Sequence, residues 1–178
     1  MSDDRNFRVL TAVGHDRPGL VSGISELIHS SGANLEDSRM AILGGEFALV
    51  LLFSGTADVV AKVAEGARAM GDKLGLEIGV KDTKHARSAR DILRYRLRVT
   101  GLDHPGIVHT ITGALSPREV NVASLQSRVV HLPLSGTPNF ELEAEVEVPP
   151  SLSVPELEET IAGVCARENL EFNFEPST

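Results

Sequence analysis

The chain has 178 residues, of which 42% are hydrophobic, and it carries a formal net charge of −8 at pH 7. That acidic balance, with 4% aromatic residues and no Trp, excludes direct nucleic-acid binding, because phosphates require clustered Lys and Arg and bases require aromatic stacking. A single cysteine excludes an intrachain disulfide, and because no apolar run of bilayer length and no secretory signal is found, we expect a cytoplasmic protein without a membrane partner.

The first predicted elements along the chain are a strand and a helix. Residues 7–13 form a short apolar run that ends at Gly14, a pattern typical of a strand. Pro18 and Gly19 then begin a helix, with proline expected in its first turn. The apolar residues of this helix recur on one face, which we expect to pack on the core: Leu20, Val21, Ile24, Leu27 and Ile28.

Two strands, a second helix and a closing strand follow. A strand over about 34–43 turns at Gly44-Gly45 into another strand over 46–53. The next helix has its own apolar stripe, formed by Val60, Val63, Ala67, Met70 and Leu74. Leu76, Ile78 and Val80 then alternate with polar residues as the last strand. The order strand, helix, strand, strand, helix, strand predicts a split-βαβ sandwich.

The whole unit then repeats. Asp16 recurs as Asp103, 87 residues later, and at the same offset Asn34 falls on Asn121. We therefore predict an α+β protein of two ferredoxin-like βαββαβ sandwiches, each with a four-stranded antiparallel sheet and two helices on one face. The first domain spans 1–82 and the second 93–178. Residues 83–92 are polar and basic without apolar periodicity, so they are predicted to link the two.

The two copies differ in their middle strands and in their sheet faces. Six additional residues make 131–139 a longer hairpin loop in the second copy. If the first strand of each copy lies beside the third, Arg94, Arg96 and Arg98 face a row of glutamates, as expected of a solvated ionic surface. The same positions of the first copy are apolar, which predicts a face covered by another domain, a second chain or a regulatory partner: Phe7, Val9, Ala48, Val50 and Leu52.

The corner between the first strand and the first helix carries the pattern D-x-P-G in both copies. A helix that begins there leaves backbone N–H groups unpaired, and with the helix dipole these suit a carboxylate. Gly19 permits close approach of a ligand, while Asp16 can accept a hydrogen bond from an ammonium group. The corner therefore suits a zwitterionic amino acid. The alternative is that Asp16 and Asp103 only cap their helices.

The pattern G-x-D-x-P-G-[LIV], followed by G-A-N-L-E-D-S-R from Gly32, resembles an ACT domain, a small amino-acid-sensing module. With the tandem arrangement, residues 34–49 are similar to the glycine cleavage system transcriptional repressor family. The resemblance implies a cytoplasmic, non-catalytic repressor without a cofactor, which contacts a transcriptional activator protein, takes glycine or another small amino acid as effector, and forms a homodimer.

The resemblance also implies where the ligand binds, namely the first turn and the start of the second strand of each copy. In the first copy these residues are Gly14, His15, Asp16, Arg17, Pro18, Gly19, Leu20 and Asn34. In the second copy they are Gly101, Leu102, Asp103, His104, Pro105, Gly106, Ile107 and Asn121. Because His15 and Arg17 are replaced by Leu102 and His104, the two sites need not share a ligand or an affinity.

Two alternatives remain at this point. An allosteric regulatory subunit of an amino-acid metabolic enzyme would have much the same sequence. An acylphosphatase-like enzyme would use Arg17 and Asn34 to hold phosphate, although the turn G-x-V-Q-G-V-x-F-R is absent. The six histidines are scattered, which predicts no metal site, and Cys165 on the last helix is expected to be a core residue rather than a nucleophile.

Overall fold

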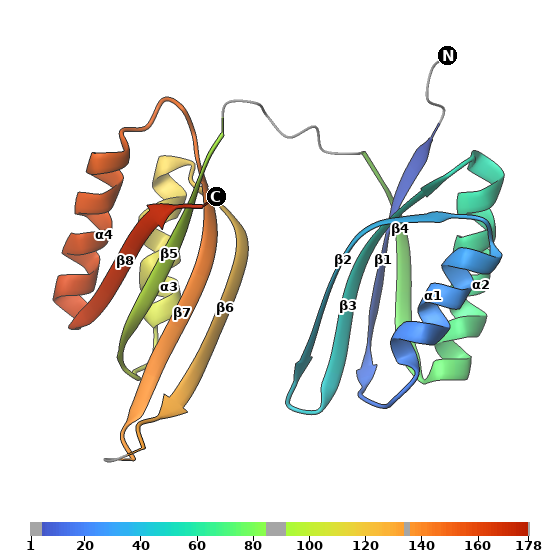
Figure 1. Cartoon of the computed structure of the whole chain (residues 1–178), viewed down its shortest axis with the longest axis horizontal. Coiled ribbons are helices and arrows are strands. Elements are labelled where there is room, and N and C mark those ends of the chain that lie inside the picture. The colour runs from blue at the N-terminus through green and yellow to red at the C-terminus, as the bar shows by residue number, and fades with distance from the viewer. Residues whose placement is uncertain (1–4, 85–91, 134–135, 178) are drawn as a thin grey trace. The chain divides into compact units, whose positions relative to one another are not determined.

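The computed structural model of the chain describes residues 5–84, 92–133 and 136–177. The chain divides into two compact units, residues 1–87 and 88–178 (Figure 1). Most of the predicted linker, 83–92, lies outside the described residues, although Thr83 at its start is the last residue of a strand. The predicted domain boundaries therefore stay predictions.

The N-terminal unit contains β1 (Asn6–His15), α1 (Leu20–Ser30), β2 (Asn34–Leu43), β3 (Glu46–Gly55), α2 (Ala57–Leu74) and β4 (Leu76–Thr83). The strands pair in the order β2-β3-β1-β4, and every pairing is antiparallel. Both helices lie on one face of this sheet (Figure 1).

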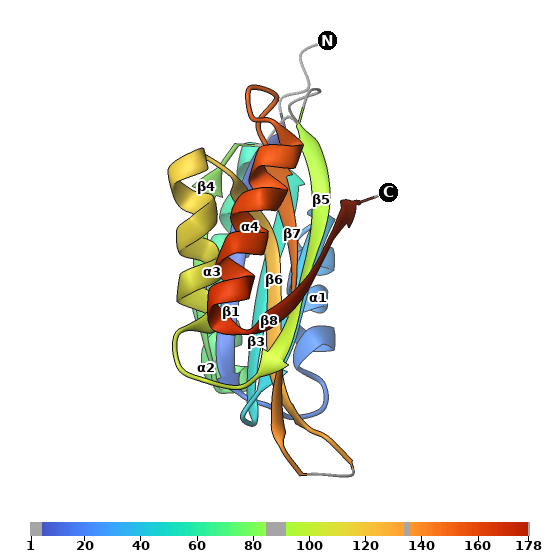
Figure 2. The same ribbon diagram turned by 90° about the vertical axis from the view of Figure 1, so that its left-hand side faces the viewer.

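The C-terminal unit repeats the arrangement with β5 (Leu93–Leu102), α3 (Ile107–Leu115), the 3-10 turn η1 (Ser116–Arg118), β6 (Asn121–His131), β7 (Pro138–Val148), α4 (Val154–Glu168) and β8 (Leu170–Pro176). Its sheet order is β6-β7-β5-β8, and α3 and α4 lie side by side over it (Figure 2). The predicted α+β fold of two βαββαβ sandwiches is confirmed. No helix in the described part of the chain is both long and apolar enough to cross a membrane.

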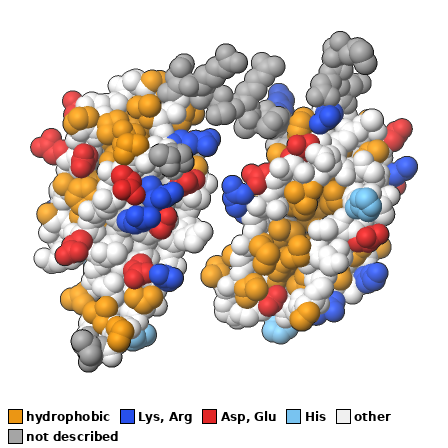
Figure 3. Space-filling model, in the orientation of Figure 1, with side chains coloured by type: hydrophobic (Ala, Val, Ile, Leu, Met, Phe, Trp, Pro, Cys, Tyr) orange, Lys and Arg blue, Asp and Glu red, His pale blue; other side chains and the backbone are white. Residues whose placement is uncertain are grey.

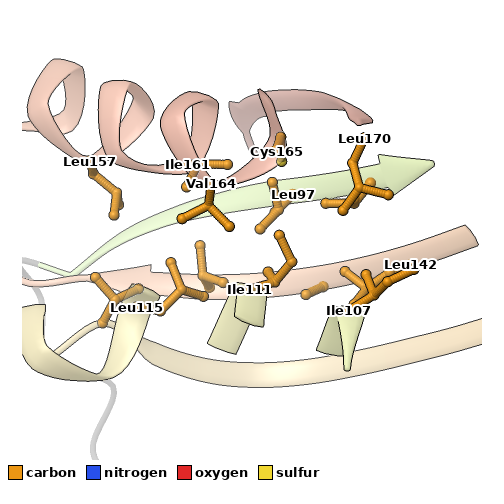
Figure 4. Close-up of a cluster of buried hydrophobic side chains, with 14 of the residues drawn as sticks. Leu97, Ile107, Ile111, Leu115, Leu142, Leu157, Ile161, Val164, Cys165 and Leu170 are labelled. Atoms are coloured by element: carbon orange, nitrogen blue, oxygen red, sulfur yellow. The ribbon is translucent and has the colours of Figure 1, made fainter. Parts of the chain in front are cut away.

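Each unit has its own hydrophobic core between its sheet and its helices. In the C-terminal unit, residues from α3, α4 and the inner strands meet there, and Figure 4 labels Leu97, Ile107, Ile111, Leu115, Leu142, Leu157, Ile161, Val164, Cys165 and Leu170. All ten are buried. The apolar helical stripes read from the sequence face the core, as amphipathic helices require. Val21 of α1 is the exception, because it is 45% exposed.

The two middle hairpins differ as the six additional residues predict. Gly44 and Gly45 both have positive φ, 61° and 87°, which the tight turn between β2 and β3 requires. In the second unit β6 and β7 extend into both ends of the predicted 131–139 loop, so the loop itself is 132–137. The Leu132 amide donates to the Thr137 carbonyl at 3.0 Å and closes its base.

The first strand of each unit lies beside the third, as the charge pattern predicts. In the C-terminal unit Arg94 pairs across the sheet with Glu147 and Arg98 with Glu143, and ion pairs of 3.4 and 3.5 Å connect these side chains. The outer face of this sheet is therefore an ionic surface, and exposed ion pairs of this kind contribute little to stability.

Candidate functional site

The corner between β1 and α1 passes through a glycine in a left-handed conformation. Gly19 has φ 97° and ψ −7°, and Gly106 repeats this geometry with φ 97° and ψ −3° before α3. Glycine is favoured there because a Cβ would clash with the backbone. The helices begin one residue later, at Leu20 and Ile107, so Pro18 and Pro105 precede the helix and do not lie in its first turn, contrary to expectation.

A backbone hydrogen bond fixes each corner against the neighbouring hairpin. The Asp16 amide donates to the Gly45 carbonyl at 2.9 Å, and the Asp103 amide donates to the Pro138 carbonyl at 3.2 Å. The longer loop of the second unit thus preserves the contact. In both units the aspartate is held at the end of the sheet where the middle hairpin turns.

The residue after each aspartate contacts the end of the second helix. Arg17 Nη2 donates to the Leu74 carbonyl at 2.8 Å and to the Lys73 carbonyl at 3.4 Å, groups that lack an intrahelical donor. In the second unit His104 Nε2 lies 3.7 Å from Glu168 Oε2 at the end of α4. This position therefore connects the corner to a helix terminus, a role that the sequence pattern does not reveal.

Gly14 and Gly101, also predicted to bind ligand, have a packing reason to be glycine. A Cβ on Gly14 would lie 2.8 Å from both the Gly75 carbonyl oxygen and Leu76 Cδ2. A Cβ on Gly101 would lie 2.5 Å from Leu170 Cδ2. The end of β1, and likewise of β5, passes so close to the start of the unit's last strand that no side chain fits.

The first turn of each helix offers backbone donors. The first helical hydrogen bond of α1 runs from the Gly23 amide to the Gly19 carbonyl at 2.9 Å, and α3 repeats it. The preceding amides, 20–22 and 107–109, therefore have no acceptor within the helix. Gly19 and Gly106 are exposed, and nothing lies within 4 Å of a Cβ built on either. The corner is open to a small anion.

The capping alternative for the two aspartates is wrong. The N-caps are Gly19 and Gly106, and neither helix receives a side-chain cap hydrogen bond. Within the described residues, neither the Asp16 nor the Asp103 carboxylate has a hydrogen-bond or ion-pair partner. Each corner thus has a carboxylate without a partner, four residues before the first amide that lacks an acceptor within the helix. A zwitterion needs both kinds of group.

Asn34 and Asn121 lie at the other end of their sheets. Asn34 is opposite Ser54 on β3, whereas His15, the last residue of β1, is opposite Glu46. Eight residues of strand separate these positions, or about 27 Å. One unit therefore does not bring its asparagine to its own D-x-P-G corner.

The asparagines have carboxylate partners that the sequence did not indicate. Asn34 Nδ2 donates to Glu36 Oε1 at 2.9 Å, and the same carboxylate accepts from the buried Ser54 hydroxyl. Asn121 Nδ2 donates to Glu147 Oε2 at 2.9 Å. No sequence signal identifies the second pair, because its residues are 26 positions apart on different strands.

The acylphosphatase-like alternative is contradicted by the same geometry. Arg17 bonds to the end of α2, and Asn34 lies about 27 Å away along the sheet. Within one module the two side chains therefore cannot hold one phosphate. Among the described residues no three His, Cys, Asp or Glu side chains come together as metal ligands.

The predicted interface residues lie on the face of the first sheet that turns away from the helices. Val9 pairs with Leu52, and Thr11 with Val50, so these side chains share the face opposite the buried Leu10 and Leu51. Phe7 and Ala48 belong to the same face. Val50 is 51% exposed. Figure 3 shows hydrophobic side chains gathered over this unit. That another protein covers them stays a prediction.

Other groups in the structure do not form part of the corner. A cavity of about 370 Å³ lies beside Arg8, Val60 and Asp82, and one of about 560 Å³ lies between α3 and α4. Cys165 is buried, and desolvation raises the pKa of its thiol, so it is a core residue rather than a nucleophile.

Comparison with known sequences identifies the first half of the chain with a known module. Residues 6–81 match the family model of the ACT domain. Over 165 residues the chain is 27% identical to the glycine cleavage system transcriptional repressor of Escherichia coli K12, covering 93% of this chain and 87% of the relative. A UPF0237 protein of Methanopyrus kandleri is 40% identical over 75 residues, which cover 41% of this chain and 83% of that protein.

Solved structures share the tandem fold of the chain. An unknown protein from Galdieria sulphuraria superposes with a TM-score of 0.80 and 26% identity, covering 98% of this chain and 99% of its own. A candidate glycine cleavage system transcriptional repressor superposes with a TM-score of 0.74 and 24% identity, covering 98% of both chains. The latter similarity concerns the fold alone.

Proposed function

The chain belongs to the ACT-domain family, and we propose that it is a non-catalytic regulatory protein that binds a small amino acid and controls a protein partner. Its similarity to a glycine cleavage system transcriptional repressor extends over 93% of the chain. That similarity supports glycine as the effector and a transcriptional activator as the partner. The net charge of −8 favours action through a protein rather than through DNA.

The observation that carries this proposal is that two kinds of group occur together at each D-x-P-G corner. These are backbone amides without an acceptor in the helix and an aspartate carboxylate without a partner among the described residues. The carboxylate of an amino acid would accept hydrogen bonds from the amides of residues 20–22, where the helix dipole also favours negative charge. Its ammonium group would donate to Asp16. The left-handed Gly19 leaves the backbone bare at this point, so a small ligand reaches the amides without a steric obstacle.

A complete site would use residues of two modules. Asn34 lies about 27 Å from the corner of its own module, so its amide can reach a ligand only at a corner of another module. Its hydrogen bond to Glu36 holds the amide in place. The asparagine would then add one donor and one acceptor to a ligand that the corner binds by its charged groups.

The two corners are not chemically equivalent. His15 lies 3.6 Å from Glu46 in the first unit, whereas the second unit has the exposed Leu102 at this position. Arg17 and His104 also differ in charge and in side-chain length. We therefore expect two binding events of different affinity rather than one class of identical sites.

Titration calorimetry with the twenty amino acids tests the proposal. Glycine or a similarly small amino acid is expected to bind, Asp16→Ala to remove one event and Asp103→Ala to remove the other. Glu65→Ala is the matched control, because it removes an exposed carboxylate in the middle of α2, two turns before the carbonyls that Arg17 contacts. Absence of heat for every amino acid with the wild-type protein would reject the sensing function.

The partner is tested by affinity capture from cells with and without the amino acid that binds. Recovery of a transcriptional activator, with the amount changed by the ligand, is the expected result. Recovery of a metabolic enzyme would instead favour the allosteric-subunit alternative. The variants Asp16→Ala and Asp103→Ala are expected to capture the partner but to lose the response to the ligand.

A further inference from the structure

We propose that the groove between α3 and α4 binds a small phosphomonoester, whose phosphate is held by Arg118 and Arg167. The two helices lie side by side (Figure 2), and a cavity of about 560 Å³ lies between them. A cavity of this volume accommodates a small molecule. None of the described residues that line it belongs to a D-x-P-G corner, so the inference goes beyond the proposed function.

The first unit shows how the equivalent groove is filled. A Cβ built on Gly66 of α2 would lie 2.7 Å from Leu27 Cδ1 of α1, and a Cβ on Gly23 of α1 would lie 3.0 Å from Leu74 Cδ1 of α2. Each leucine therefore lies directly against a glycine of the other helix. Two leucine side chains occupy the space between α1 and α2.

In the second unit smaller and polar residues replace the pair in the middle of the helices. The repeat offset of 87 residues places Ala114 at the position of Leu27. The left-handed C-caps of α2 and α4 are residues 75 and 169, 94 positions apart, and this offset places Thr160 at the position of Gly66. A methyl group thus stands where the first unit has an isobutyl group. Ala114 and Thr160 both line the cavity.

The pair at the ends of the helices is replaced as well. Thr110 stands at the position of Gly23, and Glu168 stands at the position of Leu74. The Glu168 carboxylate lies 3.7 Å from His104 Nε2, so it is directed toward the corner, and Glu168 is not among the described residues that line the cavity. Both leucines that fill the first groove are therefore missing from the second.

Two arginines extend into this groove from opposite directions. Arg118 follows α3, and its Nη1 donates to the Ala114 carbonyl, four residues earlier, at 3.1 Å. Arg167 lies near the end of α4, and its Nη1 is 3.8 Å from a Cβ built on Gly163, also four residues earlier. The start of α3 lies beside the end of α4, as the contact between His104 and Glu168 shows. The helices are therefore antiparallel, and the two guanidinium groups turn toward each other.

The two guanidinium groups lack a counter-charge. Within the described residues Arg167 has no hydrogen-bond or ion-pair partner, and Arg118 has only the Ala114 carbonyl. Because like charges repel, an anion between them would stabilise both. Guanidinium groups bind phosphate through paired N–H···O bonds. The Thr110 hydroxyl, which also has no partner among the described residues, can donate a further hydrogen bond.

Glu159 determines what else the ligand carries. This residue also lines the cavity, and within the described part of the chain its carboxylate has no ion-pair or hydrogen-bond partner. It precedes Gly163 by four residues on α4, which places it about 6 Å farther along the groove. A carboxylate at this position accepts from an amino or hydroxyl group. The ligand is therefore a phosphomonoester with such a group a few bonds from its phosphate.

Nuclear magnetic resonance titration of the isotope-labelled full chain with phosphoethanolamine tests the site. The amides of Gly113 and Gly163 should shift and saturate, with a dissociation constant below about 1 mM. Arg118→Gln and Arg167→Gln should each weaken binding by about 10-fold or more, since each removes charge-assisted hydrogen bonds. Lys62→Gln, which removes an exposed cation from α2, is the matched control and should leave the dissociation constant unchanged.

Filling the groove provides a second test that changes no charge. Ala114→Leu combined with Thr160→Gly restores the leucine and the glycine of the first unit, and this double variant should lose the shifts of Gly113 and Gly163. Its urea unfolding should remain cooperative. Shifts that persist in the folded double variant, or that are confined to the corners, would overturn the site. If the double variant does not fold, unchanged affinity in both arginine variants would overturn it.

Inorganic phosphate as a second probe tests the role of Glu159. The wild type should bind phosphoethanolamine about 3- to 5-fold more tightly than inorganic phosphate, as an exposed ion pair allows, and Glu159→Gln should remove this preference. Equal affinity for the two probes in the wild type would overturn the role of Glu159. These titrations contain no amino acid. If they succeed while no amino acid binds at the corners, the proposed function fails and the phosphate site stands.

Discussion

Gly14 and Gly19 lie five residues apart at the same corner but are glycine for different physical reasons. Gly14 has no room for a side chain because the Gly75 carbonyl oxygen and Leu76 lie within 2.8 Å of where a Cβ would be. Gly19 has open space around it and a φ of 97° that other residues rarely adopt. Gly14 is therefore required for close packing, and Gly19 is required for the left-handed backbone conformation that precedes the first amides of the helix.

Substitution should separate these two reasons. Gly14→Ala is expected to lower the free energy of unfolding by about 1–3 kcal/mol, because the obstacle includes a backbone carbonyl that cannot rotate away. Gly19→Ala should cost about 1–2 kcal/mol of backbone strain, and Gly19→Asn clearly less, since Asn tolerates left-handed φ. Urea unfolding of the three variants measures this. Equal costs for Ala and Asn at position 19 would contradict the conformational explanation.

The buried thiol of Cys165 makes stability depend on alkaline pH. Burial raises its pKa above the ordinary value of 9.0, so the folded state holds the proton where the unfolded state releases it. The contribution is complete below pH 9.0 and is lost as pH rises through the folded-state pKa. Stability should therefore fall as pH rises above 9.0, and Cys165→Ala should flatten that part of the profile. Urea midpoints measured at successive pH values provide the test.

Among the elements, β2 shows how a one-residue irregularity changes a surface. A bulge between Leu35 and Asp37 shifts the register with β3, and β6 repeats it between Val122 and Ser124. Beyond the bulge Asp37 and Arg39 lie on the outer face of the sheet. All ten residues of β2 are exposed, and an exposed edge of this length is usually paired or covered. β2 thus presents two surfaces for association, its unpaired edge and its side of the outer face of the sheet.

The corner and α2 are coupled through Arg17. Arg17→Ala should remove the hydrogen bonds to the last carbonyls of α2 and lower stability by about 1 kcal/mol. Amino-acid affinity should change less than about threefold, because the guanidinium already donates to the last carbonyls of α2. Calorimetry measures the affinity and urea unfolding measures the stability of the same samples. A large loss of affinity with unchanged stability would assign Arg17 to the ligand.

For the whole molecule, the two separate cores predict two folding units. Each unit buries its own cluster of apolar side chains, so neither cluster depends on the other for its contacts. Fragments 1–84 and 92–178 should each fold alone, with circular dichroism spectra that sum to that of the full chain. Comparison of their urea midpoints with those of the intact protein measures any coupling. A fragment that is unfolded in buffer would contradict separate domains.

The sequence by itself determined the duplicated βαββαβ order, the helical stripes and the tight turn at Gly44-Gly45. These follow from the spacing of apolar residues and from backbone preferences, which act over a few residues. It also placed Arg94 to Arg98 beside the glutamates of β7, since alternation within two strands predicts which side chains share a face.

Only the tertiary structure decided which predicted site residues come together. Asp16 and Asn34 share a motif in the sequence, yet antiparallel strands carry them to opposite ends of one sheet. The partners of Arg17 and Asn121 lie 56–57 and 26 residues away in the chain. Contacts at such separations depend on how strands and helices pack, and no local pattern of residues encodes them.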